Sequence, residues 1–237
     1  MKILIIMFYY NRPNMVRFAL DSIETQGYED FEVAFIDDGS TLPGKALVEQ
    51  YEFCEKVRFY NTHDSRYKKV HQGGSRIGLM ANRAMQSSDS DISIMLCDDD
   101  ALAEGYLAGL SGYYESNPYI AYSYGHVIPY KPRNNTRYGQ IQSSGESVLN
   151  KNILPIDPYC MVDASQVSWR TRASYDAGVR FPYPQTSALD ATLYRGLHST
   201  FGPCVFNGLS AQYKGYDDDQ LGSRNDMYDV FDMDSYG

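Results

Sequence analysis

Apolar runs of strand length alternate with segments of helical spacing along the first 125 residues. Ile3–Tyr9 is continuously apolar, which is typical of a strand buried on both faces. In the next segment Val16, Ala19, Leu20 and Ile23 fall on one helix face. The same reasoning predicts strands over residues 3–9, 31–36, 57–60, 92–96 and 119–124. It predicts helices ending near residue 27, around 47–51, over 75–86 and over 104–116.

This alternation of strands and helices predicts an α/β fold, with one mostly parallel central sheet and helices on both faces. In such sheets, ligands bind outside the carboxyl ends of the strands. Polar residues follow three of the predicted strands at that end: Tyr10-Asn11, Asp37-Asp38 and Asp98-Asp99-Asp100. We therefore expect these residues to converge on a single crevice.

The pattern is weaker after Pro129. Residues 129–160 mix Pro, Gly, Asn and Ser, which favours a long loop or hairpin region over the crevice. Beyond them we expect a strand over Val162–Trp169, a short helix over Arg170–Ala177 and a helix over Asp190–Leu197. We interpret residues 1–215 as one domain, with a nucleotide-binding half over about 1–125 and an acceptor-side half over about 126–215.

Charge divides the chain into a nearly neutral body and an acidic tail. The formal net charge is −9, and residues 216–237 contain seven Asp and one Arg. Such a balance disfavours nucleic acid as a partner. We expect the tail to be mobile, and it is a possible protein-interaction segment.

Localisation follows from the cysteines and from the absence of long apolar runs. The four cysteines form no CxxC pair, which favours reduced thiols and a cytoplasmic protein. No apolar run reaches the ~20 residues of a membrane span. We interpret the apolar opening as a buried first strand rather than a signal peptide.

The triplet Asp98-Asp99-Asp100 is the sharpest chemical feature. Adjacent carboxylates repel one another unless a cation neutralises them, and Mg²⁺ or Mn²⁺ suits carboxylate oxygens. The alternative is a solvated turn that caps the next helix. Asp37-Asp38 has the same two interpretations, as a contact to a base or ribose or as a turn. A basic segment from Arg66 to Arg76 could hold phosphates.

Several enzyme classes are disfavoured by missing motifs. The histidines have no HExxH-like spacing, which argues against zinc hydrolysis. A GxSxG elbow, a Walker A motif and a GxGxxG after the first strand are all absent. Serine hydrolase, ATPase and Rossmann oxidoreductase chemistry are therefore poor interpretations of this sequence.

Together these segments resemble family 2 inverting glycosyltransferases with the GT-A fold, over about residues 1–200. The resemblance is carried by the first strand with Tyr10-Asn11-Arg12-Pro13, by Ile36-Asp37-Asp38-Gly39-Ser40, by Ala81-Asn82-Arg83-Ala84, by Asp98-Asp99-Asp100, and by Val167-Ser168-Trp169-Arg170 with Gly178-Val179-Arg180-Phe181. Within the family the sequence is similar to the bacterial spore-coat nucleotide-diphospho-sugar transferase. Two positions depart from the family pattern: Cys97 stands at its usual first Asp, and Leu189 at the acid that precedes its base.

The resemblance implies a role for each matched residue. Tyr10 would stack on the donor base, Arg12 would line the nucleotide loop, and Asp38 would accept a hydrogen bond from the base. Arg76 would face the phosphates and Asp98 would reach the ribose. Asp99 and Asp100 would hold Mn²⁺ or Mg²⁺, and His198 is a further possible metal ligand. Asp190 would be the general base.

These roles predict an inverting transfer of a sugar from a nucleotide-diphospho-sugar to an acceptor hydroxyl. By family habit the donor would be a UDP-sugar, and the acceptor a glycan or another hydroxyl compound. Two alternatives stay open. One is a non-catalytic nucleotide-sugar or glycan-binding protein, and the other is a sugar-phosphate nucleotidylyltransferase. The latter expects a Gly-rich loop after the first strand, where this chain has Tyr9-Tyr10-Asn11-Arg12.

Overall fold

The computed structural model describes residues 1–62, 76–130, 157–158, 162–184 and 188–215. One sheet of eight strands runs through these residues, in the order β3-β2-β1-β4-β7-β6-β8-β5. The strands are β1 (Ile3–Tyr9), β2 (Phe31–Asp37), β3 (Val57–Asn61), β4 (Ile92–Cys97), β5 (Asp100–Leu102), β6 (Tyr122–Tyr130), β7 (Val167–Arg170) and β8 (Val205–Gly215). The α-helices are α1 (Pro13–Glu24), α2 (Lys45–Val48), α4 (Ile77–Ser87), α5 (Tyr106–Ser116), α6 (Thr171–Asp176) and α7 (Leu189–Phe201), with 3₁₀ helices η1 (Glu52–Lys56) and η3 (Ala164–Gln166).

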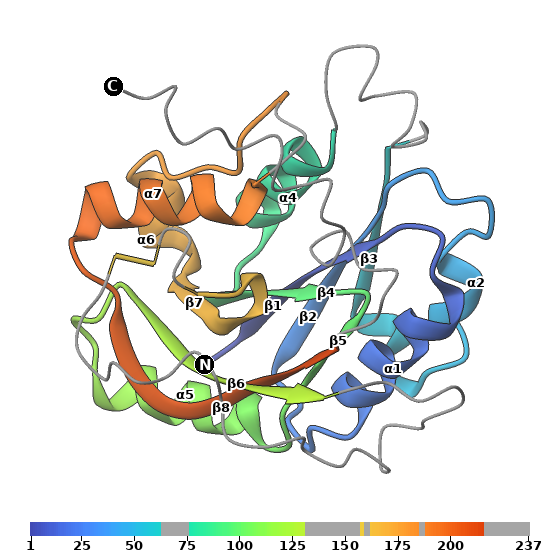
Figure 1. Cartoon of the computed structure of the whole chain (residues 1–237), viewed down its shortest axis with the longest axis horizontal. Helices are drawn as coiled ribbons and strands as arrows, with labels where there is room; N and C mark the ends of the chain where they lie inside the picture. Colours follow the sequence, from blue (N-terminus) through green and yellow to red (C-terminus); the bar gives the residue numbers. More distant parts are fainter. Residues whose placement is uncertain (63–75, 131–156, 159–161, 185–187, 216–237) are drawn as a thin grey trace.

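The predicted α/β fold is confirmed. Strands β3, β2, β1 and β4 pair in parallel, whereas β7 is antiparallel to both β4 and β6. Figure 1 shows α4, α6 and α7 above the sheet, and α1 and α5 below it. Each face has its own core cluster, and the two alternate along β1, with Ile3 and Ile5 on one side and Leu4 and Ile6 on the other. This alternation explains why β1 is apolar throughout.

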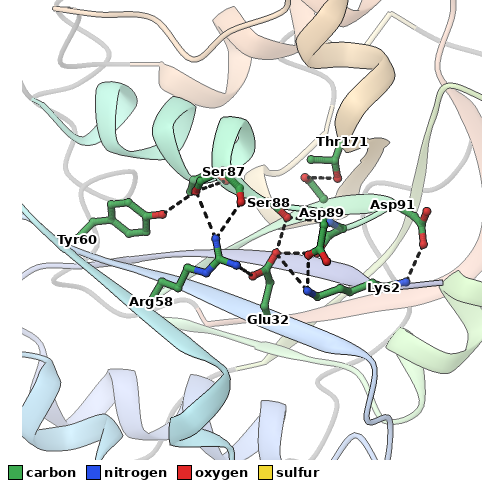
Figure 2. Close-up of polar contacts among 12 residues, drawn as sticks. Lys2, Glu32, Arg58, Tyr60, Ser87, Ser88, Asp89, Asp91 and Thr171 are labelled. Carbon is green, nitrogen blue, oxygen red and sulfur yellow. Dashed lines mark hydrogen bonds and ion pairs between the residues drawn. The ribbon is translucent and has the colours of Figure 1, made fainter.

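Polar interactions join the elements at the amino ends of the first strands (Figure 2). Glu32 of β2 is buried, accepts a hydrogen bond from Ser90 and lies 2.9 Å from Arg58 of β3. Ser88, which follows α4, also donates to Glu32. All charged groups in this network have partners, so it ties β2, β3 and α4 together at the edge opposite the predicted crevice.

One expectation about the second half is wrong, and one strand was missed. The segment Val162–Trp169 is a strand only from Val167, because Asp163 caps η3 through a capping box with Gln166. The eleven-residue strand β8 was not predicted. The pair Asn207-Gly208 is typical of a turn, but it lies within β8. Gly208 adopts a positive φ of 75° there, near a register shift between β8 and β6.

Several predicted features lie outside the described residues: most of the basic segment 66–76, most of the loop over 129–160, and the acidic tail 216–237. Among the helices that the structure does describe, none has the length and apolar character needed to cross a membrane.

Candidate active site

Arg12 forms ion pairs with two carboxylates of the site. It stands directly before α1, and its guanidinium nitrogen lies 3.2 Å from an oxygen of Asp98 and 2.9 Å from an oxygen of Asp99. The backbone N–H of Tyr10 donates to the other oxygen of Asp98 at 3.0 Å. The carboxyl ends of β1 and β4 are therefore joined, as expected for neighbouring parallel strands.

Asp98 is buried, and its pKa is raised to about 6, chiefly by that burial and secondly by the charge of Asp99. Arg12 and the Tyr10 N–H oppose the rise because both stabilise the ionised form. Arg12 therefore supplies the charge that keeps Asp98 ionised near neutral pH.

The second β-strand brings Asp37 and Asp38 to the same edge with different partners. Asp37 accepts hydrogen bonds from the backbone N–H groups of Ser40 and Gly44, so it stabilises the turn after β2. Asp38 is buried and accepts a hydrogen bond from the Thr62 hydroxyl at 3.1 Å. The turn interpretation thus fits Asp37, whereas Asp38 contacts the residue that follows β3.

Asp100 is separated from its two neighbours in the triplet. It is the first residue of β5 and faces Lys214 of β8 directly in the antiparallel register. Its Oδ2 atom lies 3.2 Å from Lys214 Nζ and accepts a hydrogen bond from Ser165. Its Oδ1 atom is buried and has no hydrogen-bond partner among the described residues.

Lys214 also lies 3.3 Å from Asp163, the cap residue of η3. Burial favours its neutral amine, but the charges of Asp100 and Asp163 outweigh this effect and raise the pKa of Lys214. The ammonium therefore stays charged and bridges two carboxylates. Lys214 and Asp163 were both missed by sequence reasoning. The spacing of Asp163 and Gln166 is typical of a capping box and could have predicted the start of a helix at Asp163. Lys214 lies in β8, which was not predicted.

Asp190 lies in the first turn of α7 and is half-buried. Burial is the main cause that raises its pKa; Asp163 adds to the rise and Lys214 opposes it. One helical turn later, the Tyr194 hydroxyl donates to the backbone carbonyl of Ala164 in η3 at 2.5 Å. The helix that carries Asp190 is thus held against the segment that contacts Lys214.

Three potential ligand atoms lie together between β4 and β5. The sulfur of Cys97 and carboxylate oxygens of Asp99 and Asp100 are all within 4.8 Å of one another. Two carboxylates, one with a buried and unsatisfied oxygen, fit a divalent cation. Burial, with a contribution from Asp100, raises the pKa of the Cys97 thiol well above its usual value. The thiol is therefore protonated when no cation is present.

Two predicted residues lie apart from this cluster. Arg76 immediately precedes α4, its side chain is exposed, and no contact within the described residues joins it to the carboxylates. His198 lies in the last turn of α7, with Nε2 3.9 Å from Asp157. It is not among the described residues that group around Cys97, Asp99 and Asp100.

A family model described as glycosyl transferase family 2 matches residues 4–172, which include all of β1 except Ile3, β2 to β4 and the Asp98–Asp100 triplet. The chain belongs to glycosyl transferase family 2. Two curated relatives are protein CgeD of Bacillus subtilis (26% identical over 100 residues, 41% of this chain and 22% of CgeD) and glycosyltransferase GlyA of Streptococcus pneumoniae (27% over 109 residues, 46% and 14%). The chain spans about a quarter or less of the length of the curated relatives that it matches.

Solved structures of TarS from S. aureus share the fold of this family 2 chain. One of residues 1–349 superposes with a TM-score of 0.68 at 17% identity, covering 91% of this chain and 60% of that one. Another, described as a complex with UDP-GlcNAc, superposes with a TM-score of 0.69 and covers 97% and 64%. The likeness identifies the GT-A type fold.

Proposed function

We propose that this chain transfers a sugar from a nucleotide-diphospho-sugar to an acceptor hydroxyl, with inversion at the anomeric carbon. One observation carries the proposal. The Arg12–Asp98–Asp99 cluster at the edge of the nucleotide half and the Asp190 helix of the acceptor half are linked through Asp100, Lys214 and Asp163. Because both halves share one sheet, we propose residues 1–215 as a single transferase domain.

A UDP-sugar is the proposed donor. A GT-A neighbour with 17% sequence identity is described as a complex with UDP-GlcNAc, which supports a donor of this class. In this chain Tyr10 and Asp38 would contact the base, Asp98 the ribose and Arg76 the diphosphate. Arg12 contributes indirectly, because it offsets part of the negative charge of Asp98 and Asp99 and holds them in place.

The reaction needs a proton acceptor and compensation of charge on the leaving group. Asp190 would take the proton of the acceptor hydroxyl while that oxygen attacks the anomeric carbon in a single displacement. A raised pKa makes a carboxylate a stronger base, which suits this role. Asp99 and Asp100 would hold a divalent cation, Mn²⁺ or Mg²⁺, which supplies charge neutralisation at the diphosphate when it is bound.

A thermal-shift panel tests the donor class. UDP, GDP, dTDP and CMP are each added with and without Mn²⁺, to the wild-type chain and to Asp99→Asn. A ligand at about 100 times its Kd stabilises a protein by roughly 2.7 kcal/mol. For a chain of this size that is about 5–10 °C. Of the four nucleotides, we expect only UDP to raise the melting temperature. The part of this rise that depends on Mn²⁺ should be lost in Asp99→Asn.

A turnover assay separates catalysis from binding alone. Release of UDP from UDP-sugars, measured with an acceptor mixture, is expected for a transferase. A UDP-dependent shift without any release of UDP would favour the non-catalytic nucleotide-sugar-binding alternative. The absence of a shift with all four nucleotides would contradict the proposed donor site.

A further inference from the structure

Asn11, which follows the proposed base-stacking residue Tyr10, has an unusual backbone conformation. Its φ angle is 51°, and among the described residues Ala188 is the only other non-glycine residue with a positive φ. This left-handed conformation is uncommon for residues with a Cβ atom, although Asn tolerates it better than most. At Asn11 it lets the chain leave β1 and turn towards α1, which begins at Pro13.

Hydrogen bonds to the turn after β2 hold Asn11 in this conformation. Its side-chain oxygen accepts hydrogen bonds from the backbone N–H of Thr41 at 2.8 Å and from the Thr41 hydroxyl at 2.7 Å. Its own backbone N–H donates to the Ser40 hydroxyl at 3.0 Å. Asn11 therefore joins the loop after β1 to the loop after β2, although Thr41 is 30 residues away along the chain.

The two joined loops carry both residues that are proposed to contact the donor base. Tyr10 directly precedes Asn11, and Asp38 directly follows β2. The backbone of each is also fixed, because the Tyr10 N–H donates to Asp98 at 3.0 Å and the Asp38 N–H donates to the Tyr9 carbonyl at 3.0 Å. Asn11 adds side-chain contacts between the loops at the position next to Tyr10.

We propose that Asn11 is a positioning residue for the donor base. It fixes the spacing between the Tyr10 ring and the Asp38 carboxylate, so that both meet one flat base without rearranging. Groups that are in place before a ligand arrives bind it more tightly, because less conformational freedom is lost on binding. The inference rests on the proposed function, but it concerns a residue to which that function assigns no role.

Exposure separates this role from a purely structural one. Asn11 and Thr41 are both exposed, so their contacts bury little apolar surface and add little to the core. The loss of these contacts should therefore affect donor binding more than folding.

Isothermal titration calorimetry with UDP and Mn²⁺ tests the proposal in the wild type, Asn11→Gly and Thr41→Val. Glycine accepts a positive φ and removes the side-chain oxygen, whereas Thr41→Val removes only the hydroxyl donor. We expect the Kd for UDP to rise about tenfold in Asn11→Gly, which corresponds to about 1.4 kcal/mol, and to rise less in Thr41→Val. Thr41→Ser keeps the hydroxyl and should bind UDP as the wild type does. An unchanged Kd in Asn11→Gly would overturn the proposal.

Transfer kinetics distinguish a positioning defect from a loss of folded protein. In Asn11→Gly the KM for the donor should rise, while kcat at saturating donor should fall by about twofold at most, because Asn11 acts at the base and not at the reacting bond. A smaller folded fraction would instead lower kcat and leave KM unchanged. That result would overturn the proposal.

Asn117→Gly is the matched control. Asn117 directly follows α5, and its side-chain amide donates to the backbone carbonyl of Tyr113 at 2.8 Å. This variant also removes an Asn side chain and its hydrogen bond to the backbone, but it should leave the Kd for UDP unchanged. Equal losses of UDP affinity in Asn11→Gly and Asn117→Gly would overturn the proposal.

The same titrations separate this inference from the proposed function. If the wild type binds no nucleotide, the proposed donor site and the role of Asn11 both fail. If the wild type binds UDP and Asn11→Gly binds it equally well, only the role of Asn11 fails.

Discussion

Lys214 lies directly opposite Asp100 across the β5–β8 pair, with Nζ 3.2 Å from Oδ2. The carboxylate is fully buried, and the ammonium side chain is 16% exposed. Breaking a buried ion pair by removing one partner typically costs about 3–5 kcal/mol, because a buried charge is left uncompensated. Loss of either partner alone should therefore destabilise the edge of the sheet that carries Asp98, Asp99 and Asp100.

The free energy of unfolding in urea measures this pair. Asp100→Asn and Lys214→Met should each lower it by about 2–4 kcal/mol, and the double variant should lose clearly less than the sum of the two. The matched control is the exposed pair Lys45–Glu49, with atoms 3.7 Å apart. Its double-variant cycle should show coupling of about 0.5 kcal/mol or less. Equal coupling in the two cycles would contradict a buried, charged Lys214.

Asp190→Asn tests the general base. The amide cannot accept the proton of the acceptor, so the transfer rate should fall by about 10²–10⁴-fold. Donor binding, measured as the UDP-dependent thermal shift, should survive. Asp176→Asn is the control, because Asp176 is an exposed helical aspartate that pairs with Arg172 at 3.1 Å. Wild-type activity in Asp190→Asn would remove Asp190 from the mechanism.

The raised pKa of Asp98 predicts how stability depends on pH. Its folded-state pKa of about 6 exceeds the usual aspartate value of 3.8, so the folded chain binds this proton more tightly than the unfolded chain does. Its contribution is therefore fully present below pH 4 and is lost as the pH rises towards 6. Asp98→Asn removes this dependence.

Urea unfolding of wild type and Asp98→Asn at pH 4 and pH 7 isolates that contribution, since the other groups cancel in the difference. Relative to the wild type, the variant should gain about 2–3 kcal/mol between the two pH values. A difference that stays constant with pH would mean that Asp98 titrates in the folded chain as it does in the unfolded one.

Gly78 in α4 lets the helix approach the loop that leads to α7. A Cβ atom there would lie 2.2 Å from the carbonyl oxygen of Pro182, and Asn82, one turn later, exchanges two 2.9 Å hydrogen bonds with the backbone of Phe181. Gly78→Ala should therefore lower the melting temperature, at a cost of about 1–3 kcal/mol.

Gly112 is the matched control for Gly78. It lies within α5, where an added Cβ atom would meet no atom within 4 Å, so Gly112→Ala should raise stability by up to about 1 kcal/mol. If Gly78→Ala behaved like Gly112→Ala, the contact between α4 and the loop would not constrain the chain.

The nucleotide half could be predicted from the sequence because its signals are local. The continuous apolar run of β1 and the period of α1 reflect burial that neighbouring residues share. The positions of Asp38 and Asp98 at strand ends followed from the same pattern, since parallel strands end at one edge. The sequence predicted a helix that begins at Asp190, the residue to which the family resemblance assigned the role of base. In the structure Asp190 lies in the first turn of α7.

The tertiary structure alone decided what neutralises the carboxylates. The sequence suggested that three adjacent Asp residues need one cation, whereas the fold turns Asp98 and Asp99 towards Arg12 and places Asp100 in another strand opposite Lys214. Lys214 is 114 residues away along the chain, in a strand whose Asn-Gly step reads as a turn. Such pairs depend on strand register, which long-range packing sets and no local pattern records.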